Sequence, residues 1–277
     1  MLTHYSGELL QHDTSYHHWA PSAASKWYLI TTIDDYSRKL LYGDFWEKET
    51  SWAHITAARY VVSQCGVALR YYVDNHSIFR FVERRDSFRK NAIPEEAGIV
   101  QWKEVLSDLG TEVIYALSPA AKGKVERPYQ WLQDHVVRTC AHEGITRIQE
   151  ARQVLYEEIH RYNYKRIHST TQEIPALRYE KALEEKRSLF RPFLLKKPFK
   201  TMEDIFCYRM ERTVNPYRKI AFHHLEFPIS GVPIREKVEL RLSLDPQTDL
   251  VTLRFWYKNQ LVGQQQVKRQ DLPKVHF

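Results

Sequence analysis

The sequence predicts an α/β domain with a mixed five-stranded sheet and covering helices, followed by a small all-β barrel. Three observations predict this arrangement. Short segments rich in Tyr, Trp, Ile and Leu open the chain, a strand–helix–strand order follows them, and alternating apolar and polar residues return near the C-terminus. At 277 residues the chain is long enough for one sizeable core and a smaller second domain.

The first third of the chain predicts a three-stranded meander. The segments GELLQHDTSYHHW, KWYLITTIDDYSR and KLLYGDFWEK read as strands, and PSAAS and DDYS supply turn residues between them. In ETSWAHITAARYVVSQCG the apolar residues recur at helical spacing, after a Thr/Ser cap and before Gly66. A helix is therefore expected after the third strand.

The middle of the chain predicts a parallel extension of this sheet. VALRYYVD is a short apolar run that ends in an acid, PEEAGIVQWKEVLSDLG reads as a helix and TEVIYAL as another strand. Strand, helix and strand in this order favour a parallel pair with a right-handed crossover. From residue 124 to about 183 the pattern is mostly helical, with breaks near 142–146 and 168–175, so helices are expected to cover the sheet.

The predicted domains are a core with a helical extension over residues 1–183, a linker over 184–202 and the barrel over 203–277. The linker mixes charged residues with two prolines in EEKRSLFRPFLLKKPFK. The barrel is predicted from VELRLSLD and LVTLRFWYKNQLVGQQQV, which alternate apolar and polar residues around the turn DPQTD.

The composition favours a polyanionic partner and a cytoplasmic protein. The chain has 41 Lys and Arg against 34 Asp and Glu, a net charge of +7 and a pI of about 9.1, so nucleic acid is the first partner expected. No apolar run approaches the roughly 20 residues that a bilayer span requires, and the N-terminus lacks the pattern of a signal peptide. The three cysteines are scattered singly, which offers neither a disulfide framework nor a CxxC zinc site.

Three carboxylates occupy unusual positions in this pattern. Asp13 interrupts the first strand, Asp74 ends the fourth and Glu126 begins a helix in the basic segment AKGKVERPYQWL. An acid within an apolar strand is costly to bury unless it binds a cation or finds donors. If the fourth strand lies beside the first, the three acids can converge, and with two divalent ions they can support in-line displacement at phosphorus. Oxygen ligands suit Mg²⁺ or Mn²⁺.

Three segments that contain these acids carry a family resemblance. LLQHDTSYHHW, YYVDNHSIF and SPAAKGKVER resemble the signature segments of DDE transposases of insertion sequences and of retroviral-type integrase catalytic cores, and the later YNYKRIHSTTQEIPALRY resembles a segment that follows the core in many transposases. The resemblance covers roughly residues 7–183. It implies an RNase H-like fold and a polynucleotidyl transferase that hydrolyses phosphodiester bonds and transfers DNA strands of a mobile element.

The resemblance also implies roles for individual residues. Asp13, Asp74 and Glu126 are expected to form the catalytic triad and to hold two Mg²⁺ or Mn²⁺ ions. The expected partners are mobile-element ends and target DNA, bound by a homo-oligomer associated with the bacterial nucleoid. The residues expected to contact DNA are Asn75, His76, Lys122, Lys124, Arg127, Arg166 and His168.

Several alternatives remain open at the level of sequence. The paired acids Asp34 and Asp35 are candidates to replace Asp13, because the first signature segment is an imperfect match. The chain could be a catalytically silent DNA-binding remnant, or a nuclease on the same fold that cuts without joining. Full-length relatives usually carry a helix-turn-helix or zinc module before the core, and this sequence starts almost on the first catalytic strand, which also admits a fragment.

Overall fold

The computed structural model describes residues 3–74, 101–116 and 123–277, with only the backbone described for 123–127. The chain divides into two compact units. The first unit contains residues 1–80 and 106–193, and the second contains 81–105 and 194–277.

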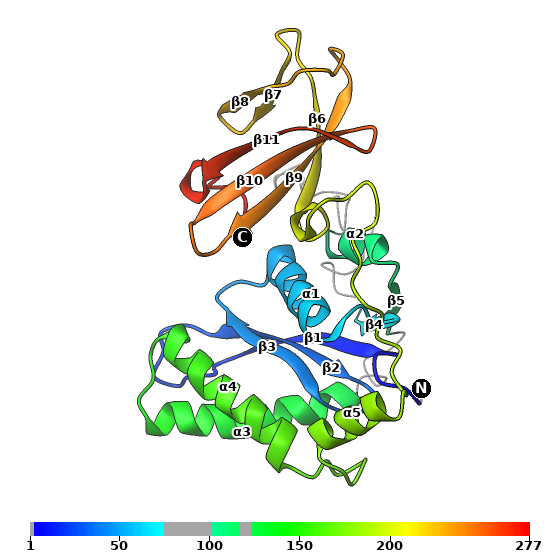
Figure 1. The fold of residues 1–277 in the computed structure, drawn as a ribbon. Coiled ribbons are helices and arrows are strands. Elements are labelled where there is room, and N and C mark those ends of the chain that lie inside the picture. Colours follow the sequence, from blue (N-terminus) through cyan, green and yellow to red (C-terminus); the bar gives the residue numbers. More distant parts are fainter. Residues whose placement is uncertain (1–2, 75–100, 117–122) are drawn as a thin grey trace. The chain divides into compact units, whose positions relative to one another are not determined.

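The first unit is built on a mixed five-stranded sheet in the order β3-β2-β1-β4-β5 (Figure 1). The first three strands pair antiparallel, as the predicted meander requires, and β4 and β5 extend the sheet in parallel beside β1. This order confirms the predicted mixed sheet. The strands are β1 (Leu10–His17), β2 (Trp27–Asp34), β3 (Leu40–Trp46), β4 (Arg70–Val73) and β5 (Glu112–Tyr115).

Helix α1 (Ser51–Cys65) covers one face of this sheet, and its ends follow the predicted signals. The Thr50 side chain accepts a hydrogen bond from the Ala53 amide, which satisfies one of the free N–H groups at the start of the helix. Gly66 follows the last turn with φ of 96°, a backbone angle that side-chain-bearing residues rarely adopt. The apolar residues of the predicted helical stripe are buried against the strands.

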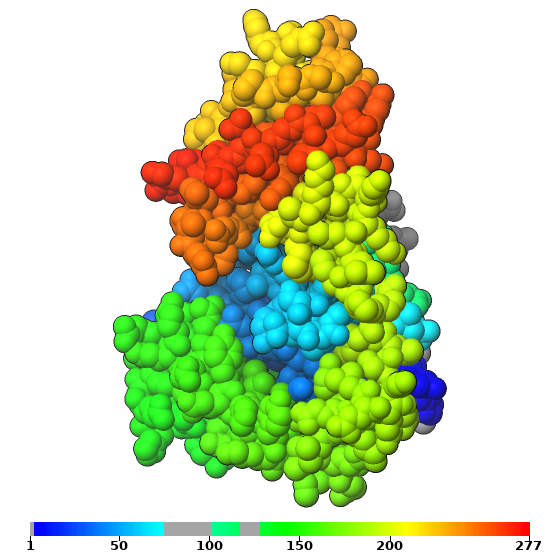
Figure 2. Space-filling model, viewed as in Figure 1, coloured from blue at the N-terminus to red at the C-terminus, as the bar shows by residue number. Residues whose placement is uncertain are grey.

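Helices α3 (Gly123–His142), α4 (Ile148–Lys165) and α5 (Pro175–Glu184) form the layer on the opposite face (Figure 1). The space-filling view shows the sheet residues (blue) between α1 (cyan) and this layer (green) (Figure 2). Helix α3 begins next to Lys124, as predicted, and carries Pro128 in its second turn. The buried core between sheet and helices includes Trp19, Leu29, Phe45, Leu132, Val136 and Leu155.

The second unit contains two antiparallel sheets, which confirms the predicted all-β region. One sheet has the order β11-β10-β9-β6, and the other pairs β7 with β8. The Phe227 and Phe255 rings lie 5.6 Å apart and help to form the core of this unit. The strands are β6 (Tyr208–Thr213), β7 (Lys219–Phe222), β8 (Leu225–Pro228), β9 (Lys237–Asp245), β10 (Leu250–Tyr257) and β11 (Gln260–Lys268).

The structure divides the alternating segment LVTLRFWYKNQLVGQQQV into two strands. Lys258 and Asn259 have φ of 48° and 61°, and they form the turn between β10 and β11. Two successive residues with positive φ match the twist of a tight hairpin. Lys258 and Asn259 lack the Asn-Gly or Asp-Gly pair typical of such turns, so the sequence does not mark this turn clearly.

Helix α2 (Gln101–Asp108) begins in the second unit. The Gln101 side-chain amide donates to the Arg209 carbonyl at 2.9 Å and accepts from the Arg209 amide at 2.7 Å. Trp102 beside it is fully buried. None of the helices that the structure describes is long and apolar enough to cross a membrane.

Candidate active site

The register between β1 and β4 brings two of the predicted acids together. These strands are parallel neighbours, with Leu10 opposite Tyr71 and Gln11 opposite Tyr72. The same register continued by two residues brings Asp13 level with Asp74, just beyond the end of β4. Neighbouring strands lie about 4.8 Å apart, so the two carboxylates are close neighbours on the sheet.

Tyr129 fastens α3 to the sheet beside these acids. Thr31 on β2 lies directly opposite Asp13, and its hydroxyl donates a 2.8 Å hydrogen bond to the Tyr129 hydroxyl. Residues directly opposite on antiparallel strands share a face, so α3 lies over the face that carries Asp13. A longer contact of 3.5 Å joins Gln133 to Ser15 further along the same strand.

Glu126 lies in the first turn of α3, three residues before Tyr129. Residues three apart on a helix are neighbours on one face, so the backbone position of Glu126 belongs to the end of α3 that Tyr129 fastens. Its side chain lies outside the described part of the chain. The described residues thus bring Asp13 and Asp74 together and place the helix turn of Glu126 over the same face.

The electrostatics of Tyr129 are dominated by burial and by acids. Burial raises the pKa of its hydroxyl well above the ordinary value, and the negative charges of Asp13, Glu49 and Asp74 act in the same direction, against the opposing hydrogen bond from Thr31. The hydroxyl therefore stays protonated beside the two carboxylates. Sequence analysis did not single out Tyr129 or Thr31, and their spacing along the chain carries no signal that links them.

A buried histidine pair lies on the opposite face of β1. His12 Nδ1 is 2.8 Å from the Thr32 hydroxyl, and His12 Nε2 is 2.8 Å from Nδ1 of His54 on α1. His54 Nε2 in turn lies 3.4 Å from a carboxylate oxygen of Glu49. These contacts link the strand that carries Asp13 to α1, and they too were not predicted from the sequence.

The alternative acid Asp34 has a structural role. Its carboxylate accepts hydrogen bonds from the Gly7 amide, the Ser6 hydroxyl, and both the amide and hydroxyl of Ser37, at 2.6–3.1 Å. Burial raises its pKa, while these donors act to lower it. Asp34 is therefore used to hold the N-terminal segment against the turn after β2.

Asp35 is occupied in the same way. It accepts from Arg38 at 2.8 Å and from the Thr3 hydroxyl at 2.8 Å, and the Gln11 side chain also donates to it. Both acids of the pair are buried. Their donors account for the pairing of acids in the sequence, and they favour Asp13 as the first acid of the site.

The predicted DNA-contacting residues divide into three groups. Asn75, His76 and Lys122 lie outside the described residues, and the side chains of Lys124 and Arg127 are likewise outside them. Arg166 and His168 are described, and both line a cavity of about 400 Å³. His168 is buried, and its Nδ1 accepts a 3.2 Å hydrogen bond from the Thr170 amide in the loop before α5.

The donor atoms of the site fit a hard divalent cation. Two carboxylates level on adjacent strands offer oxygen ligands of the kind that Mg²⁺ and Mn²⁺ prefer. Within residues 3–74, 101–116 and 128–277, no group of three or more His, Cys, Asp or Glu side chains comes together as a metal site. A third carboxylate would therefore come from a residue outside these ranges. The sequence predicts that this residue is Glu126.

Comparison with known proteins agrees with this arrangement. No family model matches the chain. A putative transposase of Sinorhizobium fredii, y4bF, is 31% identical over 157 residues, which cover 57% of this chain and 33% of that protein. The transposase for insertion sequence IS1202 of Streptococcus pneumoniae is 27% identical over 159 residues, with the same coverage of 57% and 33%. The matched part thus spans about a third of the length of these curated relatives.

The fold has a relative among solved structures. The chain superposes on one from a simian T-cell lymphotropic virus intasome, in complex with the PP2A regulatory subunit B56 gamma, with a TM-score of 0.51 at 12% identity. The alignment covers 97% of this chain and 78% of that chain. This likeness agrees with an RNase H-like fold for the sheet and its helices.

The five-stranded mixed sheet with its covering helices has an RNase H-like fold, and it carries two acids on neighbouring strands. Over 57% of its length the chain is similar to two transposases, and its fold is similar to that of the chain from the viral intasome.

Proposed function

We propose that this chain is the catalytic part of a metal-dependent DNA transposase or integrase. It hydrolyses phosphodiester bonds and transfers the DNA strands of a mobile element. The observation that carries the proposal is the register that brings Asp13 level with Asp74 under the end of α3 that carries Glu126. The similarity to two transposases supports the same function.

Asp13, Asp74 and Glu126 would hold the divalent ions, two Mg²⁺ or Mn²⁺. Bound there, the ions supply activation of the attacking oxygen and stabilisation of the departing 3′-oxygen. The protein positions the ligands: Asp13 and Asp74 are on or next to hydrogen-bonded strands, and the Tyr129–Thr31 hydrogen bond holds α3 against the sheet. Fixed ligands avoid reorganisation during the reaction, which is the main contribution of such sites to rate.

DNA is the proposed partner, namely the ends of the element and its target. The net charge of +7 supports attraction to the phosphate backbone, and Lys122, Lys124 and Arg127 are proposed to contact phosphates next to Glu126. Bringing two ends together needs at least two active sites, so a homo-oligomer on DNA, in the nucleoid, is the proposed working form.

The test is cleavage and joining of end-labelled duplex DNA in Mg²⁺ or Mn²⁺. Glu126→Gln, Asp13→Asn and Asp74→Asn keep the side-chain shape and remove the charge, so each is expected to lower nicking and joining by at least about a hundredfold. Asp134→Asn is the matched control, because Asp134 is an exposed acid on α3 that pairs with Arg138. It is expected to retain activity.

The outcomes separate the alternatives. Nicking without joining would assign the chain to nucleases on the same fold. DNA binding without either reaction, in the parent and in all variants, would contradict the catalytic proposal and leave a DNA-binding remnant. Equal losses in Asp134→Asn and Glu126→Gln would contradict the assignment of Glu126.

A further inference from the structure

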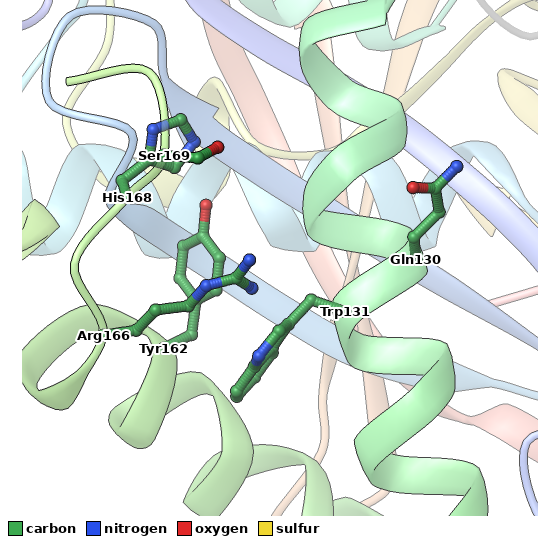
Figure 3. A pocket seen from close by; sticks show the side chains of 6 residues that line it. All are labelled: Gln130, Trp131, Tyr162, Arg166, His168 and Ser169. Carbon is green, nitrogen blue, oxygen red and sulfur yellow. The ribbon is translucent and has the colours of Figure 1, made fainter. Parts of the chain in front are cut away.

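A cavity of about 400 Å³ lies between α3 and the segment that ends α4 (Figure 3). Its volume falls within the range of small-molecule binding sites. Figure 3 shows the Trp131 side chain on α3 pointing toward the side chains from α4 and the loop after it, whereas the Gln130 side chain points away from them. The lining residues are Gln130, Trp131, Tyr162, Arg166, His168 and Ser169.

Two aromatic rings and one guanidinium group form the walls of this cavity. The Trp131 and Tyr162 rings are 5.4 Å apart with an angle of 59° between their planes. The guanidinium carbon of Arg166 lies 5.3 Å from the centre of the Trp131 ring and 5.6 Å from that of Tyr162. Arginine in this position offers a flat cationic surface on which a planar ring can stack.

The Trp131 side chain is held in place by a second residue of α3. His135, one turn further along α3, stacks on its ring at 4.2 Å with an angle of 26°. The nitrogen Nδ1 of His135 lies 3.6 Å from the buried carboxylate of Glu158, which also pairs with Arg161 at 2.7 Å. A wall fixed in this way loses little conformational freedom when a ligand binds.

Two donors in the cavity have no hydrogen-bond partner among the described residues. They are the buried Tyr162 hydroxyl and one buried terminal nitrogen of Arg166. The Tyr162 side chain is only 1% exposed. A buried polar group without a partner costs free energy, so an acceptor that enters the cavity would gain from both donors.

The remaining lining residues add hydrogen-bonding groups and no negative charge. Ser169 offers a hydroxyl. Because His168 Nδ1 accepts from a backbone amide, its Nε2 carries the proton and is a donor. Arg166 is the one formally charged residue of the six, so the cavity favours a ligand that joins a planar ring to an anionic group.

We propose that this cavity binds one unstacked nucleotide of the DNA substrate. The base lies against Trp131 and the guanidinium of Arg166, and the adjoining phosphate accepts hydrogen bonds from Arg166 and Tyr162. Stacking on an aromatic side chain tolerates every base, so the site selects an unpaired nucleotide rather than a sequence. The inference rests on the proposed function, because α3 also carries Glu126 and Tyr129 next to the candidate active site.

The experiment uses short duplex DNA with one unpaired 2-aminopurine nucleotide at a 5′ end, compared with the same duplex made blunt. The fluorescence of this base falls when it stacks on an aromatic ring. The full chain is expected to quench it and to bind the overhang DNA about tenfold more tightly than the blunt DNA, as one stacked base provides.

Three variants and a control locate the effect. Arg166→Gln and Trp131→Leu are expected to abolish both the quenching and the tenfold preference. Tyr162→Phe removes only a hydroxyl that has no partner, so it preserves the fold and is expected to reduce the preference about threefold or more. Lys165→Gln removes one charge from an exposed neighbour on α4 and is expected to keep both effects. Thermal unfolding confirms that each variant is folded.

Three other outcomes would overturn the proposed nucleotide site. Equal affinity for both duplexes without quenching, while metal-dependent nicking persists, contradicts the nucleotide site and leaves the proposed function intact. Equal losses in Lys165→Gln and Arg166→Gln show a general effect of charge. Absence of binding to either duplex contradicts the proposed function and this inference together.

Discussion

Tyr129 combines a structural contact with a position beside the candidate metal site, and its hydroxyl can be tested by itself. Tyr129→Phe removes a buried 2.8 Å hydrogen bond to Thr31. The loss leaves the Thr31 hydroxyl buried, so the free energy of unfolding is expected to fall by about 1–2 kcal/mol. Strand transfer is expected to fall as well, because α3 is held less firmly over Asp13.

A double-mutant cycle with Thr31→Val separates the bond from other effects. If the two hydroxyls act through one hydrogen bond, the double variant loses much less stability than the two single losses combined, with a coupling of about 1 kcal/mol. Chemical denaturation measures the stabilities, and the joining assay measures activity. Additive losses would contradict the role of this bond.

Asp34 and Asp13 are expected to respond in opposite ways to the same substitution. Asp34→Asn leaves a side chain with one acceptor oxygen where Ser6, Gly7 and Ser37 donate to two. It is expected to lower the free energy of unfolding by about 1–3 kcal/mol. Nicking by the folded fraction is expected to persist, whereas Asp13→Asn is expected to lower it by at least about a hundredfold. Loss of nicking in folded Asp34→Asn protein would restore Asp34 as a candidate ligand.

The difference in unfolding free energy between the parent and Asp34→Asn is expected to change with pH in one direction. Burial raises the pKa of Asp34 above its ordinary value of 3.8, so the folded chain binds this proton more tightly than the unfolded chain. The resulting stability is fully present below about pH 4 and is lost as the pH rises through the folded pKa. The difference in unfolding free energy between parent and Asp34→Asn is therefore expected to decrease with rising pH in denaturation experiments, and an increase would contradict the raised pKa.

At the scale of elements, periodicity predicted most of the fold. The strands of the meander and α1 are local in sequence, with clear turn residues, and Thr50 and Gly66 mark the helix ends that the structure has. The parallel pairing of β4 with β5 followed from the strand–helix–strand order. The pairing of β4 with β1 was a condition for Asp13 and Asp74 to converge, and the structure meets it. Local propensity and topology agreed in these segments.

Contacts between distant segments could not be predicted in the same way. Thr31 and Tyr129 are 98 residues apart, and neither has a composition signal that points to the other. The acids Asp34 and Asp35 matched a catalytic pattern by residue type, and only their donors show their structural use. The turn at Lys258 and Asn259 lacks the glycine that usually marks a two-residue hairpin turn, so the sequence does not reveal it.

The packing of α4 on β3 depends on a glycine. A Cβ at Gly43 would lie 2.5 Å from Cδ1 of Ile159, which is closer than two carbon atoms can approach. Because Cδ1 ends a flexible side chain that can turn aside, Gly43→Ala is expected to lower the free energy of unfolding by only about 1 kcal/mol. Ile159→Val removes the opposing methyl group and is expected to restore part of the loss in the double variant.

A second glycine provides the control for this prediction. Gly263 lies in strand β11, and a Cβ there would make an ordinary 3.6 Å contact with Phe255. Gly263→Ala is therefore expected to change stability little. Urea unfolding of the three single variants and the double variant measures the effect, and a Gly43→Ala loss that Ile159→Val does not reduce would show that the strain lies elsewhere.

For the whole molecule, the predicted boundary between the linker and the second domain stays a prediction, and the structure suggests how to test it. The second unit includes residues 101–105, which are far in sequence from residues 194–277 of the same unit. The Gln101 side chain satisfies both backbone groups of Arg209, on the edge strand β6. A fragment of residues 203–277 lacks this contact and exposes those groups at the edge.

The fragment is therefore expected to unfold at a lower temperature, and less cooperatively, than the same unit in the full chain. In the full chain, Gln101→Ala is expected to cost about 2 kcal/mol, because it leaves a buried N–H and C=O without partners. Gln153→Ala, which changes an exposed glutamine on α4, is the control and is expected to cost little. Tryptophan fluorescence and circular dichroism during unfolding measure both effects. A fragment as stable as the unit in the full chain would show that residues 203–277 fold without α2, as the sequence boundary predicts.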